Sequence, residues 1–246
     1  MRGIPEIRCG MFRKSNAACS EREGLMISIP FFVFLLLAFL TGCVPFAYIL
    51  VKRMRGVDIR TQGSGNVGAT NASRVLGRKW GLVVLALDTL KGVVAALFLP
   101  WVLFLFHNPS VYERWLGLEG TQMILGMAAF LGHCYNPFLR FKGGKGVATA
   151  LGVFLIVSWK ATVLTAIVCL AIIAATRLVS VASIVAAILL PTAMLTFQLM
   201  AKVPEAPWYQ RLNWQVLTMT VLISVVVVIR HRANIKRLLV GKEHKA

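Results

Sequence analysis

The sequence predicts an all-α, polytopic membrane protein with seven transmembrane helices, a periplasmic N-terminus and a cytoplasmic C-terminus. Of its 246 residues, 58% are hydrophobic and 15% are charged, and the mean hydropathy is +0.74. The apolar runs approach the ~20 residues that cross the hydrocarbon core of a bilayer. The basic residues between these runs cluster in alternate loops, which sets the orientation.

The first 25 residues are polar and differ sharply from the rest of the chain. Met26 opens an apolar stretch from Ile27 to Leu50. Two interpretations stay open: the native chain begins at Met26, or residues 1–25 form a disordered tail. A secretory signal is not expected, because no clean small-residue cleavage site follows a short apolar core. Residues 26–246 are predicted to form a single transmembrane domain.

Seven apolar segments are predicted to span the membrane. They are residues 27–50, 81–106, 121–139, 146–158, 161–176, 181–200 and 213–230. The fourth and fifth are short, and 146–176 is alternatively one long helix. A hairpin at Trp159–Lys160 places 17 of the 27 basic residues on one side. Because positive loops stay in the cytoplasm, the hairpin and seven spans are favoured.

Charge and cysteine content exclude other classes. The formal net charge is +18, but no basic domain with interleaved aromatic residues is present, so nucleic-acid binding is not expected. The five cysteines form no CxxC pair and three lie in or beside apolar spans, which favours buried apolar roles over zinc or disulfides. We predict no metal and no cofactor.

The first polar segment is glycine-rich and runs from Gly63 to Asn71, followed by Arg74. It matches GxGxxG, but it follows a membrane span rather than a strand of a soluble βαβ unit, so a dinucleotide site is excluded. Glycines let backbone N–H groups converge on a phosphate. The alternative is a flexible turn. Its predicted phosphate ligands are Ser64, Gly65, Asn66, Gly68, Thr70, Asn71 and Arg74.

The second polar segment contains Lys142-Gly143-Gly144-Lys145-Gly146 at the predicted start of a helix. It is not a Walker A loop, because Gly146 stands where that motif has Ser or Thr. Glycines, lysines and a helix N-terminus nonetheless favour an anion. The alternative is a loop whose lysines extend to the interface.

Two further polar segments follow later spans. Arg177, Ser180 and Ser183 lie at a predicted helix N-terminus, where they either bind an anion or only anchor and pack the helix. His231 and Asn234 share one helical face in a basic tail that ends in Gly241-Lys242-Glu243. By itself this tail is more typical of an anchor for anionic lipid.

Asp88 and Lys91 lie within the second predicted span, three residues apart. A charge at the bilayer centre costs about 2.5–3.5 kcal/mol on insertion scales. We therefore expect the two side chains to pair, and we interpret the pair as structural support for a site.

In order along the chain, SGNVGATN with Arg74, LDTLKG, GHCYNPFLRFKGGKGVAT, RLVSVAS and HRANIKRLL–GKE resemble the PlsY family of bacterial glycerol-3-phosphate acyltransferases. The resemblance runs from about Met26 to Lys245, with a looser match at residues 41–45. It implies seven helices in the bacterial inner membrane and a cytoplasmic site for phospholipid biosynthesis. The implied reaction takes acyl phosphate and glycerol 3-phosphate to lysophosphatidic acid and phosphate, with an upstream enzyme supplying acyl phosphate.

The resemblance and the residues together suggest direct attack on the acyl phosphate. The sequence has no GxSxG elbow, no Cys–His pair and no HxxxxD box. A substrate phosphate is favoured as the base, with His231 as the other candidate. The predicted catalytic residues are Ser64, Asn66, Lys145 and His231. The predicted substrate-binding residues are Gly65, Gly68, Thr70, Asn71, Arg74, Lys142, Gly143, Gly144, Arg177, Ser180, Ser183, Asn234 and Glu243.

The competing hypothesis is a membrane transporter of a phosphorylated small molecule. It would account for the anion-binding loops and the Asp88–Lys91 pair. Transporters place their broken helices and binding site near the midplane of the membrane. Here all four polar segments are predicted on one face, so the acyltransferase is favoured.

Overall fold

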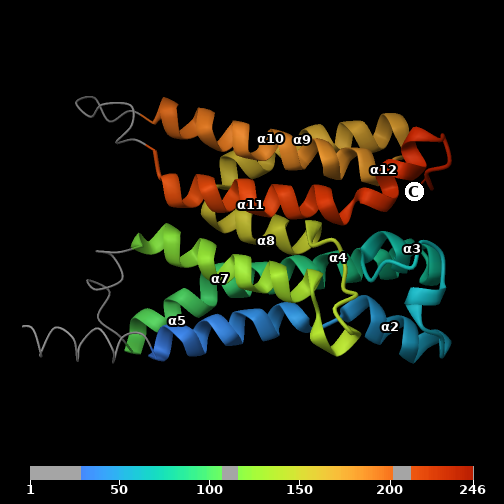
Figure 1. The fold of residues 1–246 in the computed structure, drawn as a ribbon, viewed down its shortest axis with the longest axis horizontal. Coiled ribbons are helices and arrows are strands. Elements are labelled where there is room, and N and C mark those ends of the chain that lie inside the picture. Colours follow the sequence, from blue (N-terminus) through green and yellow to red (C-terminus); the bar gives the residue numbers. More distant parts are fainter. Residues whose placement is uncertain (1–28, 107–115, 202–211, 246) are drawn as a thin grey trace, which may run out of the picture.

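The computed structural model describes residues 29–106, 116–201 and 212–245, and every regular element within these ranges is helical. The helices lie side by side along the long axis of the molecule, and the chain runs back and forth between its two ends (Figure 1). The all-α prediction is confirmed. Residues 1–25 and the proposed start at Met26 lie outside the described residues.

The first membrane segment consists of two helices in one continuous rod. A helix over residues 29–43 is followed by α2, Phe46–Arg55, and the break falls at Val44–Pro45, because proline has no N–H to continue the ladder. The helix extends five residues beyond the predicted end at Leu50. Its last turn carries Lys52, Arg53 and Arg55, which favour a helix C-terminus.

The second segment is longer than predicted and begins with a short helix. The 3₁₀ turn η1, Ile59–Thr61, and α3, Ala69–Leu76, precede α4, Arg78–Val93. A π-helical turn, η2, Val94–Phe98, leads into α5, Leu99–Phe106. The π turn ends two residues before Pro100, whose ring and missing N–H disturb the preceding turn. α3 lies in the first polar segment and was not predicted from the sequence.

In the middle of the chain, one helix is shorter than predicted and two helices form a hairpin. α7, Gly117–Cys134, ends five residues before the predicted limit of 139, because Asn136 and Pro137 begin a separate turn, η3, Pro137–Leu139. α8, Val147–Val157, and α9, Trp159–Thr176, meet at Ser158.

The two helices on either side of Ser158 form a hairpin. Val147 of α8 and Cys169 of α9 line the same cavity. A single straight helix would hold these residues about 33 Å apart. The alternative of one long helix over 146–176 is therefore excluded.

The last two segments complete the bundle. α10, Val179–Met200, contains Pro191, and α11, Trp214–Arg230, is followed by α12, Arg232–Leu239. α11 and α12 meet at an angle of 54°. This bend turns α12 across the end of the bundle, where the C-terminal segment also lies (Figure 1).

Four described helices are long and apolar enough to cross a membrane, and α11 with α12 makes a fifth. The four are Ile29–Arg55, Arg78–Leu105, Trp159–Thr176 and Val179–Met200. α8 has 11 residues and extends about 16 Å, roughly half of the ~30 Å core. Length and composition alone therefore give four to five spans.

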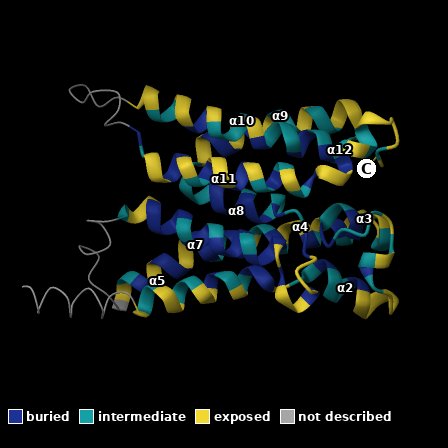
Figure 2. Ribbon diagram, viewed as in Figure 1, coloured by how far each residue is buried: buried dark blue, intermediate teal, exposed yellow. Residues whose placement is uncertain are grey.

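The outer surface of the bundle is apolar. Exposed residues lie on the outward faces of the helices and buried ones between them (Figure 2). The exposed side chains include Leu82, Leu170 and Ile188, each more than 60% accessible. Such a surface is suited to lipid tails rather than to water.

Glycines allow the helices to approach closely, as in other membrane bundles. A Cβ on Gly92 of α4 would collide with the Thr149 carbonyl of α8, and one on Gly152 of α8 with the Thr89 carbonyl of α4. A Cβ on Gly132 of α7 would meet the Phe39 carbonyl of the first helix. These contacts fix α8, and the polar loop that precedes it, against the rest of the bundle.

Candidate functional site

The polar segments gather at one end of the bundle, around a cavity of about 160 Å³. This end carries α2, α3, α12 and the C-terminal segment (Figure 1). The predicted site residues that line the cavity are Ser64, Asn66, Gly68, Thr70, Asn71, Arg74, Lys145, Ser180, Ser183, His231, Asn234 and Glu243. Asp88 also lines it. We call this space the polar cavity.

The first glycine loop, residues 63–68, is held by the buried side chain of Asn71. Its Oδ1 accepts a hydrogen bond from the Ser64 N–H at 3.0 Å. Its Nδ2 donates to the carbonyls of Gln62, Asn66 and Ile59 at 2.9, 3.1 and 3.3 Å. The amide of Asn71 is thus used within the protein, so this residue shapes the loop that presents Ser64 and Asn66.

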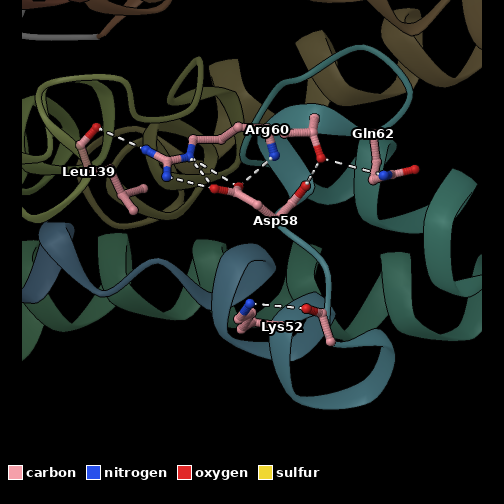
Figure 3. A network of polar contacts seen from close by, with 7 residues as sticks. Lys52, Asp58, Arg60, Gln62 and Leu139 are labelled. Atoms are coloured by element: carbon pink, nitrogen blue, oxygen red, sulfur yellow. Dashed lines mark hydrogen bonds and ion pairs between the residues drawn. The ribbon is translucent and has the colours of Figure 1, made fainter.

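A second network fastens the start of this loop to the neighbouring loop (Figure 3). The Asp58 carboxylate accepts from the Arg60 guanidinium at 2.6 and 3.0 Å, and Arg60 Nη1 donates to the Leu139 carbonyl at 3.5 Å. The Arg60 hydrogen bond lowers the pKa of Asp58, and the carboxylate caps η1. The network joins the chain before Gly63 to the turn that precedes Lys142.

The second glycine loop, residues 143–146, is held from outside by Arg230. The guanidinium donates to the Gly143 carbonyl at 2.6 Å and to the Gly144 carbonyl at 2.9 and 3.1 Å. It also lies 5.5 Å from the centre of the Tyr135 ring. The Gly144 N–H donates to the His133 carbonyl at 3.1 Å. Gly144 was predicted to bind substrate, and its N–H is used within the protein to fix the loop.

Lys145 emerges from this loop between the two glycine segments. Its Nζ donates to Asn234 Oδ1 at 2.5 Å. Burial, and then the neighbouring positive charges, outweigh Glu243 and lower the pKa of Lys145 to about 8. The ammonium is half-buried and forms no ion pair with any residue that the structure describes, which favours an incoming anion.

His231 lies between α11 and α12, and Asn234 follows in α12. His231 is buried, its Nδ1 lies 2.8 Å from the Val227 carbonyl, and burial followed by the Lys145 charge lowers its pKa to about 4. The ring is therefore neutral near pH 7. If Nδ1 carries the proton toward that carbonyl, Nε2 is left as an acceptor.

Glu243 ties three elements together at the mouth of the polar cavity. Its carboxylate accepts from Asn234 Nδ2 at 2.6 Å, Arg237 Nε at 2.8 Å and Ser180 Oγ at 3.1 Å. Burial raises the pKa of Glu243, but these hydrogen bonds outweigh it, so the net pKa is lowered. Arg74 donates to the backbone carbonyls of His244 and Lys245, which follow Glu243, at 3.3 and 3.4 Å.

Ser183 on α10 and Arg177 before it were both predicted to bind substrate, but they are placed differently relative to the polar cavity. Ser183 lines the polar cavity, but its hydroxyl donates to the Val179 carbonyl at 2.9 Å. Arg177 ends α9 in a left-handed conformation with φ 58° and is exposed. Arg177 does not line the polar cavity, and its role in binding substrate stays a prediction.

Asp88 and Lys91 are buried beneath the site and form an ion pair of 2.9 Å. Lys91 Nζ also donates to the Val44 carbonyl at 3.1 Å and faces the Phe46 ring at 5.7 Å. His133 Nδ1 lies 3.8 Å from the Asp88 carboxylate. The pair thus connects the break in the first segment to the helix that ends beside the second glycine loop.

The polar cavity contains two carboxylates, because Asp88 and Glu243 both line it. The structure also adds Arg230 to the residues that support the site. Arg230 was counted only among the basic residues that set topology. No local signal distinguishes it, because its partners Gly143 and Gly144 are 86 to 87 positions away.

An apolar cavity of about 300 Å³ adjoins the polar one. The two share Val147, Leu151 and Ser183, so they meet at the N-terminal part of α8. The apolar cavity continues between α8, α9, α10 and α11 toward Phe154 and Leu190.

An apolar helical bundle with a polar, lysine-bearing cavity that opens onto an apolar one defines an integral membrane enzyme for a substrate with a polar head and an apolar chain. The family model for glycerol-3-phosphate acyltransferase matches residues 32–241. The chain therefore belongs to the glycerol-3-phosphate acyltransferase family and is an acyltransferase of phospholipid synthesis, which confirms the resemblance in the sequence.

Individual relatives agree with the family match. The chain is 40% identical over 209 residues to glycerol-3-phosphate acyltransferases of Desulforudis audaxviator and Aquifex aeolicus, covering 85% of this chain and 92% and 95% of theirs. It is similar to a crystal structure of PlsY in its glycerol 3-phosphate form, with a TM-score of 0.70 and 38% identity, covering 88% of this chain and 95% of that one. The lysophosphatidic acid form gives a TM-score of 0.67.

Proposed function

We propose that this enzyme transfers a fatty acyl group from acyl phosphate to the hydroxyl of glycerol 3-phosphate, giving lysophosphatidic acid and phosphate. The observation that carries the proposal is the junction of a polar and an apolar cavity at Val147, Leu151 and Ser183. A bond formed at this junction joins a phosphate-bearing alcohol to an apolar chain. An upstream enzyme that forms acyl phosphate would supply the donor.

The topology that goes with this function has seven passes through a bacterial inner membrane, with the N-terminus outside and the site on the cytoplasmic side. Described helices occupy all seven predicted segments, and the end of the bundle that carries α2, α3 and α12 also carries most of the basic residues. Positive loops are retained in the cytoplasm. The placement suits substrates that arrive from the cytoplasm.

Glycerol 3-phosphate would bind in the polar cavity. Arg74, Ser180 and Asn234 line it and offer a guanidinium, a hydroxyl and an amide. A phosphate would accept charge-assisted hydrogen bonds from these donors. Arg74 would then exchange its weak bonds to the C-terminal carbonyls for a bidentate contact with phosphate.

The chemistry we propose is a direct attack without an acyl-enzyme. The substrate hydroxyl oxygen forms a bond to the acyl carbon, the bond from that carbon to the phosphate oxygen breaks, and the hydroxyl proton passes to the departing phosphate. Ser64, Asn66 and Lys145 would stabilise the oxyanion that develops on the carbonyl. Positioning two bound substrates contributes up to about 7–11 kcal/mol in favourable cases.

The substrate phosphate remains the favoured base. A neutral His231 is able to accept a proton through Nε2, but its pKa of about 4 makes it a weak base near pH 7. A phosphate leaving an acyl group is more basic, and it is already present where the proton is released.

The test is an acyl-transfer assay on purified protein in lipid, with glycerol 3-phosphate and either palmitoyl phosphate or palmitoyl-CoA. We expect lysophosphatidic acid from palmitoyl phosphate alone, and a loss of product in Lys145→Ala. Product from palmitoyl-CoA alone would refute the donor. The matched control is Lys79→Ala, because Lys79 is exposed at the start of α4 and lines neither the polar cavity nor the apolar one.

A further inference from the structure

The break at Val44–Pro45 turns two backbone carbonyls of the first membrane segment toward other elements. In a continuous helix, the carbonyls of Cys43 and Val44 would accept from N–H groups four residues further along, but the helical ladder stops at the proline. The Cys43 carbonyl accepts from Nδ2 of the buried Asn136. The Val44 carbonyl accepts from Nζ of the buried Lys91 at 3.1 Å. The break is therefore an attachment point for two side chains from distant parts of the chain.

Asn136 connects the break to the turn that precedes the second glycine loop. Its Oδ1 accepts from the Phe138 N–H at 3.0 Å. Its backbone carbonyl accepts from the N–H groups of Leu139 and Phe141 at 3.1 and 2.8 Å. The turn leads directly into Lys142 and the glycines. The residue that binds the break therefore also holds the chain that enters the loop.

This turn has a backbone conformation that needs support. Arg140 and Phe141 have φ of 54° and 60°, in the left-handed region that residues other than glycine seldom adopt. Such a conformation persists only where surrounding contacts fix it. The contacts of Asn136 supply that support, so the turn would relax if Asn136 lost its place at the break.

Lys91 connects the break to the other end of the loop through two further side chains. Its Nζ lies 2.9 Å from Asp88 Oδ1, and the same oxygen lies 3.8 Å from His133 Nδ1. The His133 carbonyl accepts from the Gly144 N–H at 3.1 Å, and a Cβ on Gly144 would lie 2.1 Å from His133 Nε2. The residue after Gly144 is Lys145. Both ends of the loop are thus tied to the same break.

Two of the proposed ligands for glycerol 3-phosphate are held by a different part of the chain. Arg74 on α3 donates to carbonyls of the C-terminal segment, and Ser180 on α10 donates to Glu243. A shift of the second glycine loop would therefore displace Lys145 and leave Arg74 and Ser180 in place.

From these contacts we infer that Pro45, Lys91 and Asn136 are positioning residues for Lys145. The proline frees the two carbonyls, and the two side chains bind them and so fix the depth of the second glycine loop in the bundle. None of the three lines the polar cavity, so each acts through the loop. The inference rests on the proposed role of Lys145 at the reacting carbonyl.

The first experiment replaces Pro45 by alanine. Alanine restores the N–H and favours the helix, so the ladder closes and takes back the carbonyls of Cys43 and Val44. We expect an unchanged or higher unfolding temperature in detergent, with kcat for palmitoyl phosphate about tenfold to 100-fold lower. The KM for glycerol 3-phosphate should stay unchanged, a separation that a general loss of structure would not give.

The control is Pro191→Ala, which removes a proline from the interior of α10. It should leave kcat and the KM for glycerol 3-phosphate unchanged. If Pro45→Ala keeps its kcat, or raises the KM for glycerol 3-phosphate by the factor that it lowers kcat, the inference is overturned.

The second experiment tests whether the proline and the lysine act by one route. Asp88→Asn with Lys91→Met removes the ammonium without leaving a buried unpaired charge, and kcat should fall as in Pro45→Ala. Adding Pro45→Ala to this pair should cause no further loss, because coupled changes are not additive. Losses that multiply would mean independent effects and would overturn the shared route.

The third experiment does not depend on the acyl donor. Labelling of Lys145 by trinitrobenzenesulfonate is followed by mass spectrometry, with the exposed Lys79 as the reference in each protein. We expect Lys145 to react about fivefold faster in Pro45→Ala, the value of roughly one lost hydrogen bond, and at the wild-type rate in Pro191→Ala. Equal rates in all three proteins overturn the inference. Wild-type inactivity with palmitoyl phosphate, with faster labelling in Pro45→Ala, refutes only the proposed donor.

Discussion

The two glycine loops look alike in sequence but are supported in different ways. The loop of residues 63–68 is organised by Asn71, which lies seven positions after Ser64. The loop of residues 143–146 is organised by Arg230, 86 to 87 positions away. The first loop is a local motif held by the side-chain amide of Asn71, which is close to it in sequence. The other depends on the packing of α11 beside α8.

Because of this difference, the two loops present different groups to a ligand. In the first loop, the Asn71 amide is used to hold the backbone, and Ser64 and Asn66 are left to line the polar cavity. In the second loop, both glycine carbonyls and one N–H are used within the protein, so Lys145 is the residue of that loop whose side chain is offered to a ligand. Glycine thus serves close approach in the second loop more than phosphate binding.

The largest expected effect comes from Gly144→Ala. An added Cβ would collide with the His133 ring and the Val67 carbonyl, so the loop and Lys145 must shift. A displacement of about 1 Å costs about 100-fold in rate. The measurement is kcat/KM with palmitoyl phosphate. Gly56→Ala is the control, because Gly56 has φ 71° but open space around it. Near-normal activity of Gly144→Ala would show that the loop tolerates movement.

Asn71→Ala should have the next largest effect. It leaves one N–H and three carbonyls without their partner, which costs about 2–3 kcal/mol and loosens Ser64 and Asn66. We expect a lower unfolding temperature in detergent together with a fall in kcat. Asn213→Ala removes the amide that caps α11 at its first turn and should lower stability by about 1 kcal/mol while kcat is preserved. Equal loss of kcat in both variants would contradict a specific role for Asn71.

Arg230→Lys tests the remote support of the second loop. A lysine keeps the charge but cannot donate to two carbonyls in a fixed fork. We expect kcat/KM to fall about tenfold, the value of roughly one lost charge-assisted bond. Arg232→Lys, at an exposed neighbour on α12, should be silent. An unchanged rate in Arg230→Lys would mean that charge alone holds the loop.

The smallest effect is a pH dependence that separates Lys145 from His231. The pKa of Lys145 is lowered to about 8, so its ammonium is lost as pH rises through 8, and activity should halve near pH 8. It should then fall up to about tenfold per further pH unit. His231, with a pKa of about 4, should produce no limb between pH 6 and 7. Lys145→Arg should remove the alkaline limb, and a limb that persists in it belongs to another group.

Much of the fold followed from apolar run length and from the positions of basic residues. The helices begin and end within a few residues of the predicted segments, except where Asn136 and Pro137 end α7 early and where α2 continues to Arg55. The short helix α3 was not predicted, because eight residues carry too little periodic signal beside longer spans. The region of α12 was expected to be helical only through the shared face of His231 and Asn234. The distribution of basic residues favoured a break between α8 and α9. The structure confirms it, because Val147 of α8 and Cys169 of α9 line the same cavity.

The candidate site was less predictable in its detail. Polar side chains in ordered motifs were recognised as a set, and most of them line the polar cavity. The role of each residue was not recognised, because Asn71 and Gly144 use their hydrogen-bonding groups within the protein. Arg177 remained outside because the left-handed end of α9 leaves it on the surface.

By itself, the sequence determined that the chain is a helical membrane protein with several phosphate-suited segments at one face. It also carried the family resemblance, because burial in lipid demands long apolar helices and because polar motifs recur in a fixed order. The tertiary structure decided which segments touch, which polar groups already have hydrogen-bond partners, and that a polar and an apolar cavity meet at the start of α8. Many of these facts depend on contacts between residues 63 to 170 positions apart, and such contacts arise only when the helices pack.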